Sequence, residues 1–129
     1  MGILNPLKNL QFYNESEQVK GTNLTCKTVM KHYDDGDGVK VTFYENGTFI
    51  GRAYTCAYKG KPHAFLHGLE VKEKYRGKGY GTQILKYMIN TYHVRVLYVN
   101  KNNPAINLYK RSGFRQTGNF DNDFIIMER

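Results

Sequence analysis

β-branched and aromatic side chains, most of them apolar, are concentrated in residues 39–44 and 48–58. This composition is typical of strands. The two stretches flank Asn46 and Gly47, a dipeptide that tolerates the positive φ of a tight turn, so they predict a β-hairpin. Residues 63–71 predict the next strand, in which regular alternation would place every second side chain from position 63 to position 71 on one face.

The segment before the hairpin has a weaker pattern. Residues 24–33 alternate loosely and end in an Asp- and Gly-rich turn signal at 34–38, which predicts another strand. The acidic turn lacks the Glu that closes a calcium-binding loop, so we expect no metal site there. Residues 14–20 are compatible with a short helix.

The hydrophobic period changes to that of a helix over residues 79–92, where positions 84, 85, 88, 89 and 92 are apolar. A nearly continuous apolar strand follows at 94–99. A strand, a helix and a second strand in this order form a right-handed crossover, which places the two strands side by side and parallel. We therefore expect a crevice for a ligand at the ends of these strands.

A second helix is predicted over residues 105–112. Asn103 is a suitable N-cap, Pro104 favours the first turn, and Gly113 follows the last turn. Residues 114–116 and 123–127 predict the closing strands, of which the second is a candidate edge for a homodimer. The predicted fold class is a mixed α/β domain.

Composition limits the classes of protein that fit. The chain has 129 residues, which is enough for one domain, and its 40% hydrophobic content excludes global disorder. No stretch is long and apolar enough to span a bilayer, and the start resembles no secretion signal, so we expect a cytoplasmic protein. The net charge of +8 favours an anionic partner, which could be nucleic acid, a membrane surface or a phosphorylated small molecule.

The two cysteines, Cys26 and Cys56, are isolated in the sequence and show no metal-ligand spacing. Buried free thiols are the simpler interpretation, and a disulfide between them stays open.

A glycine-rich segment, Arg76-Gly77-Lys78-Gly79-Tyr80-Gly81-Thr82, lies between the strand at 63–71 and the helix that follows it. Glycines allow backbone N–H groups to approach an anion, and the start of a helix attracts phosphate. The spacing matches neither the dinucleotide-binding GxGxxG pattern nor the P-loop, and a tight strand-to-helix connection would also use glycines. Nearby lysines add positive charge, so a multiply phosphorylated ligand fits this segment best.

A second motif follows the strand at 94–99 and reads Asn-x-x-Ala-x-x-Leu-Tyr-x-x-x-Gly-Phe from Asn102 to Phe114. Together with Arg-x-x-Gly-x-Gly from Arg76, it resembles the GNAT superfamily of acyl-CoA-dependent N-acetyltransferases. The resemblance covers residues 61–114. It implies a single GNAT-like domain over residues 1–129, with a mixed, mostly antiparallel sheet, a splayed strand and flanking helices.

The resemblance also assigns roles to residues of this chain. It implies that acetyl-CoA is the co-substrate, with its pyrophosphate on the backbone of the glycine-rich segment and its pantetheine arm along Leu69 and Val71 and beside Asn102. The amide of Val71 would meet the thioester carbonyl, and Tyr109 would meet the departing thiol. The residues predicted to bind the cofactor are Leu69, Val71, Arg76, Gly77, Lys78, Gly79, Tyr80, Gly81, Thr82 and Asn102.

Two catalytic residues are predicted, Tyr109 and His67. Tyr109 without the surrounding motif would be read as a core aromatic residue. A base is needed because an alkyl ammonium must lose a proton before it can attack. At the position where relatives can carry a Glu, six residues before Val71, this chain has Phe65. We therefore assign the role of the base to His67, acting directly or through water. The alternative is that His67 is a structural histidine.

The leading function is therefore transfer of an acetyl group from acetyl-CoA to a primary amine, by direct attack with both substrates bound. The acceptor, a small molecule or a protein amine, is not identified by the sequence, because the family's usual pair of helices after the first strand has no convincing counterpart here. A non-catalytic acyl-CoA-binding module is the runner-up. Nucleic-acid binding is disfavoured, because the basic residues concentrate at the glycine-rich segment.

Overall fold

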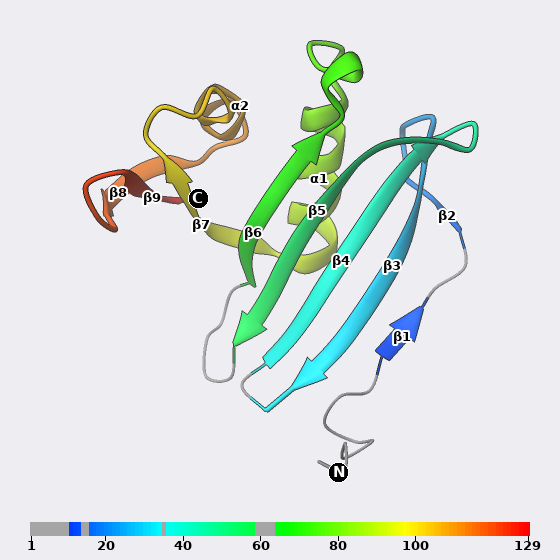
Figure 1. Cartoon of the computed structure of the whole chain (residues 1–129), viewed down its shortest axis with the longest axis horizontal. Helices are drawn as coiled ribbons and strands as arrows, with labels where there is room; N and C mark the ends of the chain where they lie inside the picture. Colours follow the sequence, from blue (N-terminus) through cyan, green and yellow to red (C-terminus); the bar gives the residue numbers. More distant parts are fainter. Residues whose placement is uncertain (1–10, 14–15, 35, 59–63) are drawn as a thin grey trace.

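The computed structural model describes residues 11–13, 16–34, 36–58 and 64–129. These residues form a nine-stranded sheet in the order β1-β3-β4-β5-β6-β7-β9-β8 (Figure 1). The ninth strand, β2, pairs with the first residues of β3. Neighbouring strands are antiparallel except for the parallel pair β6 and β7. The strands are β1 (Gln11–Tyr13), β2 (Glu17–Gln18), β3 (Leu24–Tyr33), β4 (Gly36–Glu45), β5 (Thr48–Tyr58), β6 (Ala64–Val71), β7 (Val94–Asn100), β8 (Arg115–Asn119) and β9 (Phe124–Glu128).

The predicted hairpin is confirmed as β4 and β5, which pair from Glu45 and Thr48 at the turn to Gly36 and Tyr58 at the far end. The turn residues Asn46 and Gly47 have φ values of 51° and 81°, the left-handed conformation that this dipeptide accepts.

The short helix predicted for residues 14–20 is wrong in the part that the structure describes. Glu17 and Gln18 form β2, which pairs with β3, and a turn follows in which Thr22 N–H donates to the carbonyl of Val19. The edge of β3 provides backbone hydrogen-bond partners that a free helix of this length would lack. Residues 14 and 15 lie outside the described residues.

The two helices predicted over residues 79–92 and 105–112 are both present. Helix α1 (Tyr80–Tyr92) starts after Gly79 and buries Ile84, Leu85 and Met88 completely. Helix α2 (Ala105–Arg111) starts where the side-chain oxygen of Asn103 accepts the Ala105 N–H at 2.8 Å, and it ends before Gly113, whose φ is 94°. A short 3-10 turn, η1 (Glu73–Tyr75), precedes the glycine-rich loop.

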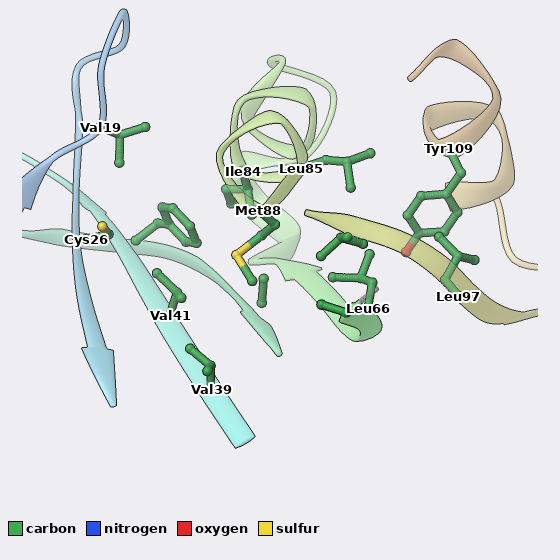
Figure 2. Packing of buried hydrophobic residues seen from close by; sticks show 14 of the residues in the cluster. Val19, Cys26, Val39, Val41, Leu66, Ile84, Leu85, Met88, Leu97 and Tyr109 are labelled. Carbon is green, nitrogen blue, oxygen red and sulfur yellow. The ribbon is translucent and has the colours of Figure 1, made fainter. Parts of the chain in front are cut away.

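The hydrophobic core lies on one face of the sheet, beneath α1 and α2. Figure 2 shows Ile84, Leu85 and Met88 pointing from α1 toward the sheet and Tyr109 pointing from α2 toward Leu97. No helix of the described residues covers the opposite face, where Tyr54, Tyr98 and Phe120 are exposed. None of the described helices is both long and apolar enough to cross a membrane.

The regular alternation predicted for residues 63–71 is wrong, because a β-bulge lies at His67. Thr55 pairs with Leu66, but the next residue along β5, Tyr54, pairs with Gly68. The bulge adds one residue to β6 and therefore reverses the alternation beyond it. Phe65 consequently lies on the open face, against the ring of Tyr98 at 6.0 Å, whereas Leu69 and Val71 face the helices.

Residues 123–127 do not form an edge available to a dimer partner. Strand β9 lies between β7 and β8, and both of its sides are paired. Strand β8 is the outer strand at this end of the sheet, because the chain returns to pair β9 with β7.

Candidate active site

Strands β6 and β7 separate within the sheet. They pair only from Ala64 and Val94 to Leu66 and Leu97, although β6 continues to Val71 and β7 to Asn100. Figure 1 shows the two strands diverging toward the end that leads into α1 and α2. This divergence confirms the predicted splayed strand, and within the described part of the chain no strand pairs with the inner edge of β6 beyond Leu66.

The register of β5 and β6 determines where the backbone of that edge points. Val71 lies opposite Gly51, and the N–H of Lys72 donates to the carbonyl of Ile50 at 2.8 Å. Val71 is therefore in a non-hydrogen-bonded pair, so its own N–H and carbonyl point away from β5 and toward the gap. The same holds for Leu69, which lies two residues earlier, opposite Ala53. Two backbone N–H groups of β6 thus face the divergence.

A cleft of about 830 Å³ opens at this place. Its walls come from the end of β6, the glycine-rich loop, the first turn of α1 and one side of α2. The lining residues are Leu69, Glu70, Val71, Tyr75, Arg76, Gly77, Gly79, Tyr80, Gly81, Thr82, Asn103, Pro104, Ala105, Leu108 and Arg111.

The glycine-rich loop presents a series of backbone donors to this cleft. In the described part of the chain, the N–H groups of residues 77–82 have no backbone acceptor, and the first helical bond runs from Gln83 N–H to the carbonyl of Gly79 at 3.3 Å. Gly77 and Gly79 have φ values of 77° and 88°, and a Cβ placed on either would meet open space. The loop therefore offers an open cradle of N–H groups at a helix start, an arrangement that suits a phosphate group.

Positive side chains border this cradle. Arg76 and Arg111 line the cleft from opposite sides, and Arg76 Nε donates to the carbonyl of Val71 at 2.8 Å. That bond ties the loop to the end of β6. Lys74 and Lys78 lie beside the ring of Tyr75, with their Nζ atoms 5.1 and 5.9 Å from its centroid. Lys78 does not itself line the cleft.

Two glycines bring the walls of the cleft together. A Cβ on Gly81 would lie 3.1 Å from Leu108 Cδ2, so the start of α1 packs closely on α2. A Cβ on Gly51 would lie 2.3 Å from the carbonyl oxygen of Glu70, so β5 and the end of β6 approach each other closely only because residue 51 is glycine.

Tyr80 lines the cleft, and its hydroxyl is directed elsewhere. The hydroxyl donates to Glu45 Oε1 at 2.8 Å, and this bond, with some burial, raises the pKa of Tyr80. The side chain therefore anchors the first turn of α1 to the end of β4, and the contribution of Tyr80 to the cradle is its backbone.

Tyr109 is buried, with 5% of its surface exposed, and its ring packs edge-on against Phe114 at 6.0 Å. Burial raises the pKa of its phenol above the ordinary value, so the hydroxyl is protonated at neutral pH. Ala105, Leu108 and Arg111, which share a neighbouring side of α2, line the cleft instead.

His67 lies at the bulge, close to the last paired residues of β6 and β7, and does not line the cleft. Its Nε2 is 2.8 Å from the Sγ of Cys56, within hydrogen-bonding distance, and both residues line a second, shallower hollow. The two residues predicted to be catalytic, Tyr109 and His67, therefore lie on different faces of the sheet.

Asn102 is exposed, and its N–H donates to Asn100 Oδ1 at 2.9 Å. The next residue, Asn103, lines the cleft. The sequence interpretation missed Asn103, Tyr75 and the side of α2 formed by Ala105, Leu108 and Arg111. Ala105, Leu108 and Arg111 are spaced three residues apart, and this helical spacing could have predicted that they share one side of α2.

A model of the acetyltransferase (GNAT) family matches residues 7–114. The chain belongs to the GNAT family. Sheet order, parallel pairing of β6 with β7, and the splay beyond residue 66 agree with the fold expected of a GNAT domain. A search of curated proteins found no match to the sequence.

Several solved structures share the GNAT fold with this chain. The PaiA N-acetyltransferase of Thermoplasma acidophilum, solved in complex with coenzyme A, is 22% identical, with a TM-score of 0.59 over 71% of this chain and 60% of that one. The ribosomal-protein-S18-alanine N-acetyltransferase of Escherichia coli is 24% identical, with a TM-score of 0.56 over 70% of this chain and 66% of that one. The chain thus spans about two thirds or less of the length of these proteins.

Proposed function

We propose that this chain is an acyl-CoA-dependent N-acetyltransferase that moves an acetyl group from acetyl-CoA to a primary amine, by direct attack with both substrates bound. The observation that carries the proposal is the divergence of β6 and β7 beside the N–H cradle of residues 77–82. It combines, in one cleft, unpaired strand amides with an anion-binding helix start. Membership of the GNAT family and the coenzyme A bound to the Thermoplasma relative support it.

The backbone of the loop would hold the pyrophosphate. Arg76 and Arg111 add charge from both sides of the cleft, and Thr82 places a hydroxyl at its wall. The pantetheine arm would run along the inner edge of β6, where the N–H and carbonyl groups of Leu69 and Val71 point into the gap. Asn102 remains a proposed contact at the other side, next to Asn103 in the wall.

Acetyl-CoA supplies a thioester, whose carbonyl oxygen gains negative charge as the amine attacks. The N–H of Val71 points toward the gap and would donate a hydrogen bond to that oxygen. A donor fixed in place before the reaction stabilises developing charge without reorganisation. The hydrogen bond from Arg76 to the Val71 carbonyl holds this end of the strand in place.

Tyr109 would donate its hydroxyl hydrogen bond to the departing thiolate. A phenol of pKa ~10 is a weaker acid than a thiol of pKa ~8.5, so complete proton transfer is already unfavourable, and burial raises the pKa of Tyr109 further. We therefore assign Tyr109 a hydrogen-bonding role rather than that of a full proton donor.

His67 would accept the proton of the attacking amine. It is the next residue of β6 after the last pair that β6 forms with β7, at the start of the divergence. An imidazole there can act directly or through a water molecule. The acceptor itself is a small-molecule or protein amine, and the basic cleft disfavours strongly cationic acceptors.

Thermal unfolding with and without acetyl-CoA tests the cofactor assignment before any acceptor is known. Ligand at ~100 times its dissociation constant adds about 2.7 kcal/mol, which raises Tm on the order of 10 °C for a domain of this size. Gly79→Glu should abolish the shift, because it puts a bulky negative side chain into the cradle. Gly21→Glu is the matched control, since Gly21 also has positive φ and open space but lies in the turn before β3. Absence of a shift in the wild type would refute the cofactor assignment.

An amine panel then separates a transferase from a binding module. We expect release of coenzyme A with at least one primary amine, and loss of turnover in His67→Gln mainly below pH 8. A Tm shift without transfer to any amine would favour the non-catalytic acyl-CoA-binding function. Unchanged turnover of His67→Gln from pH 6 to pH 9 would exclude His67 as the base.

A further inference from the structure

The open face of the sheet carries a hollow of about 360 Å³, lined by residues of β3, β4, β5 and β6. Strand register explains why the surface is hollow there. One cross-strand row contains Lys31, Gly38, Cys56 and Phe65, and the next row contains Val29, Lys40, Tyr54 and Gly68. Each row therefore includes a glycine, and a glycine between larger neighbours leaves a depression in a sheet surface.

Cys56 lines this hollow and pairs with Gly38 of the neighbouring strand β4. It is a free, half-buried thiol, and the imidazole Nε2 of His67 lies 2.8 Å from its Sγ. An imidazole at this distance can take the thiol proton and leave a thiolate, which is the nucleophilic form of cysteine. Phe65, which pairs with Cys56, and His67 lie on the same face of β6, so strand register brings Cys56 and His67 together.

Positive charge surrounds the pair. Lys31 of β3 and Lys40 of β4 line the hollow, and Tyr54 of β5 and His67 of β6 are the other titratable groups around it. The row beyond Tyr54 contains Arg52 and Glu70, whose charges are paired with each other at 3.4 Å. Neighbouring ammonium groups attract an anionic reactant.

The other cysteine has the opposite environment. Cys26 is fully buried under α1, and burial raises the pKa of its thiol. In the described residues no group of three or more His, Cys, Asp and Glu side chains could hold a metal ion. Of the two thiols, Cys56 is the more exposed and the one with an imidazole within hydrogen-bonding distance.

We propose that Cys56 is a reactive thiol that forms a mixed disulfide with a small, acidic thiol compound, with His67 as its base. The reactant is a low-molecular-weight disulfide. The Cys56 thiolate attacks one of its sulfur atoms, a new S–S bond forms as the original S–S bond breaks, and the second sulfur leaves as a thiolate that takes the proton held by His67. Lys31 and Lys40 would bind the carboxylates of the added group. This chemistry does not depend on acetyl transfer.

Alkylation of the native protein by iodoacetamide, followed by peptide mass spectrometry, tests the thiol. We expect Cys56 to react at pH 7 about tenfold faster than a cysteine in an unstructured peptide, while Cys26 is protected. His67→Gln and His67→Asn should slow Cys56 about tenfold and shift the rise in rate to higher pH. His93→Asn is the matched control. His93 is the residue that ends α1, on another element than Cys56, and it has a left-handed conformation that Asn accepts.

Exchange with disulfides of different charge tests the reactant class. We expect glutathione disulfide, which is acidic, to modify Cys56 several-fold faster than the neutral 2-hydroxyethyl disulfide. Replacing Lys31 and Lys40 together by Gln should remove that preference, whereas Lys86→Gln on the exposed side of α1 should retain it.

Two results would overturn the proposal. The cysteine–histidine pair would be refuted if Cys56 were alkylated no faster than the peptide cysteine. It would also be refuted if the alkylation rate stayed unchanged in both His67 variants while these proteins still unfolded cooperatively. Equal exchange rates for the two disulfides in the wild type would refute an acidic reactant. Neither measurement uses acetyl-CoA, so failure here is distinguishable from failure of the proposed acetyltransferase function.

Discussion

The two faces of the sheet carry sites of different construction. On the helix-covered face, the cleft uses backbone N–H groups from nearly consecutive residues of β6, the glycine-rich loop and the start of α1. On the open face, the hollow uses side chains contributed by four strands. A site made of neighbouring backbone groups depends on local conformation, whereas a site made of cross-strand side chains depends on register. The two sites should therefore fail under different substitutions.

The largest expected effect comes from the strand spacing that supports the cleft. In Gly51→Ala the new Cβ would lie 2.3 Å from the Glu70 carbonyl oxygen, so β5 and β6 must move apart at the cleft end. We expect the free energy of unfolding to fall by about 3 kcal/mol, measured by urea denaturation. The acetyl-CoA-induced rise in Tm should also be lost.

Gly68→Ala is the matched control on the same two strands. Its Cβ would approach Tyr54 Cδ2 at 3.6 Å, an ordinary contact, so the free energy of unfolding should change by less than about 0.5 kcal/mol. Wild-type stability and a full acetyl-CoA response in Gly51→Ala would show that this spacing does not position the cleft.

An intermediate effect is expected at Tyr109, on the cleft face. Tyr109→Phe keeps the ring packing against Phe114 and removes the hydroxyl, so turnover should fall about 10- to 100-fold with little change in stability. Because burial raises the pKa of Tyr109, turnover should not decline from phenol ionisation as pH rises to about 9.5. The measurement is coenzyme A release with an accepted amine.

Tyr98→Phe serves as the control for the open face, since Tyr98 is 47% exposed there. Its turnover should match the wild type. If Tyr109→Phe turned over as fast as Tyr98→Phe, the assigned role of the hydroxyl would be wrong.

The smallest expected effect concerns Cys26, the buried cysteine on the helix-covered face, and is a change in how stability depends on pH. Burial raises the pKa of this thiol in the folded protein, so the unfolded chain ionises first as pH rises. The free energy of unfolding should consequently fall by about 1 kcal/mol from pH 8 to pH 9.5 on account of Cys26, given an unfolded pKa of ~8.5. In Cys26→Ala the decline over this interval should be shallower by that amount. Equal slopes in urea titrations of both proteins would contradict the burial of the thiol.

Much of the architecture could be predicted from the sequence because its signals are local. Asn46-Gly47 specified the hairpin turn, the period of 3.6 specified α1, and Asn103 and Gly113 bracket α2 as expected. The glycine-rich loop was also visible, because consecutive residues supply the cradle. The prediction for residues 14–20 failed because pairing with β3 determined their conformation.

The arrangement of the side chains predicted to be catalytic could be foreseen less well from the sequence. A single extra residue in β6 reverses the alternation at His67, and nothing in the composition of residues 63–71 marks the bulge. Phe65 and Leu69 therefore lie on opposite faces although their spacing predicts one face. The interior position of β9 also depended on the return of the chain beside β7, which no local pattern encodes.

The sequence by itself determined most of the elements, the glycine-rich loop and the family resemblance, because turns, caps and helical periodicity depend on residues a few positions apart. The tertiary structure decided where β6 leaves β7, which strand amides face the cleft, and that Cys56 meets His67. These features follow from strand register and from one bulge, which are fixed by packing between segments distant in the chain. Contacts of that kind exist only after the sheet has assembled.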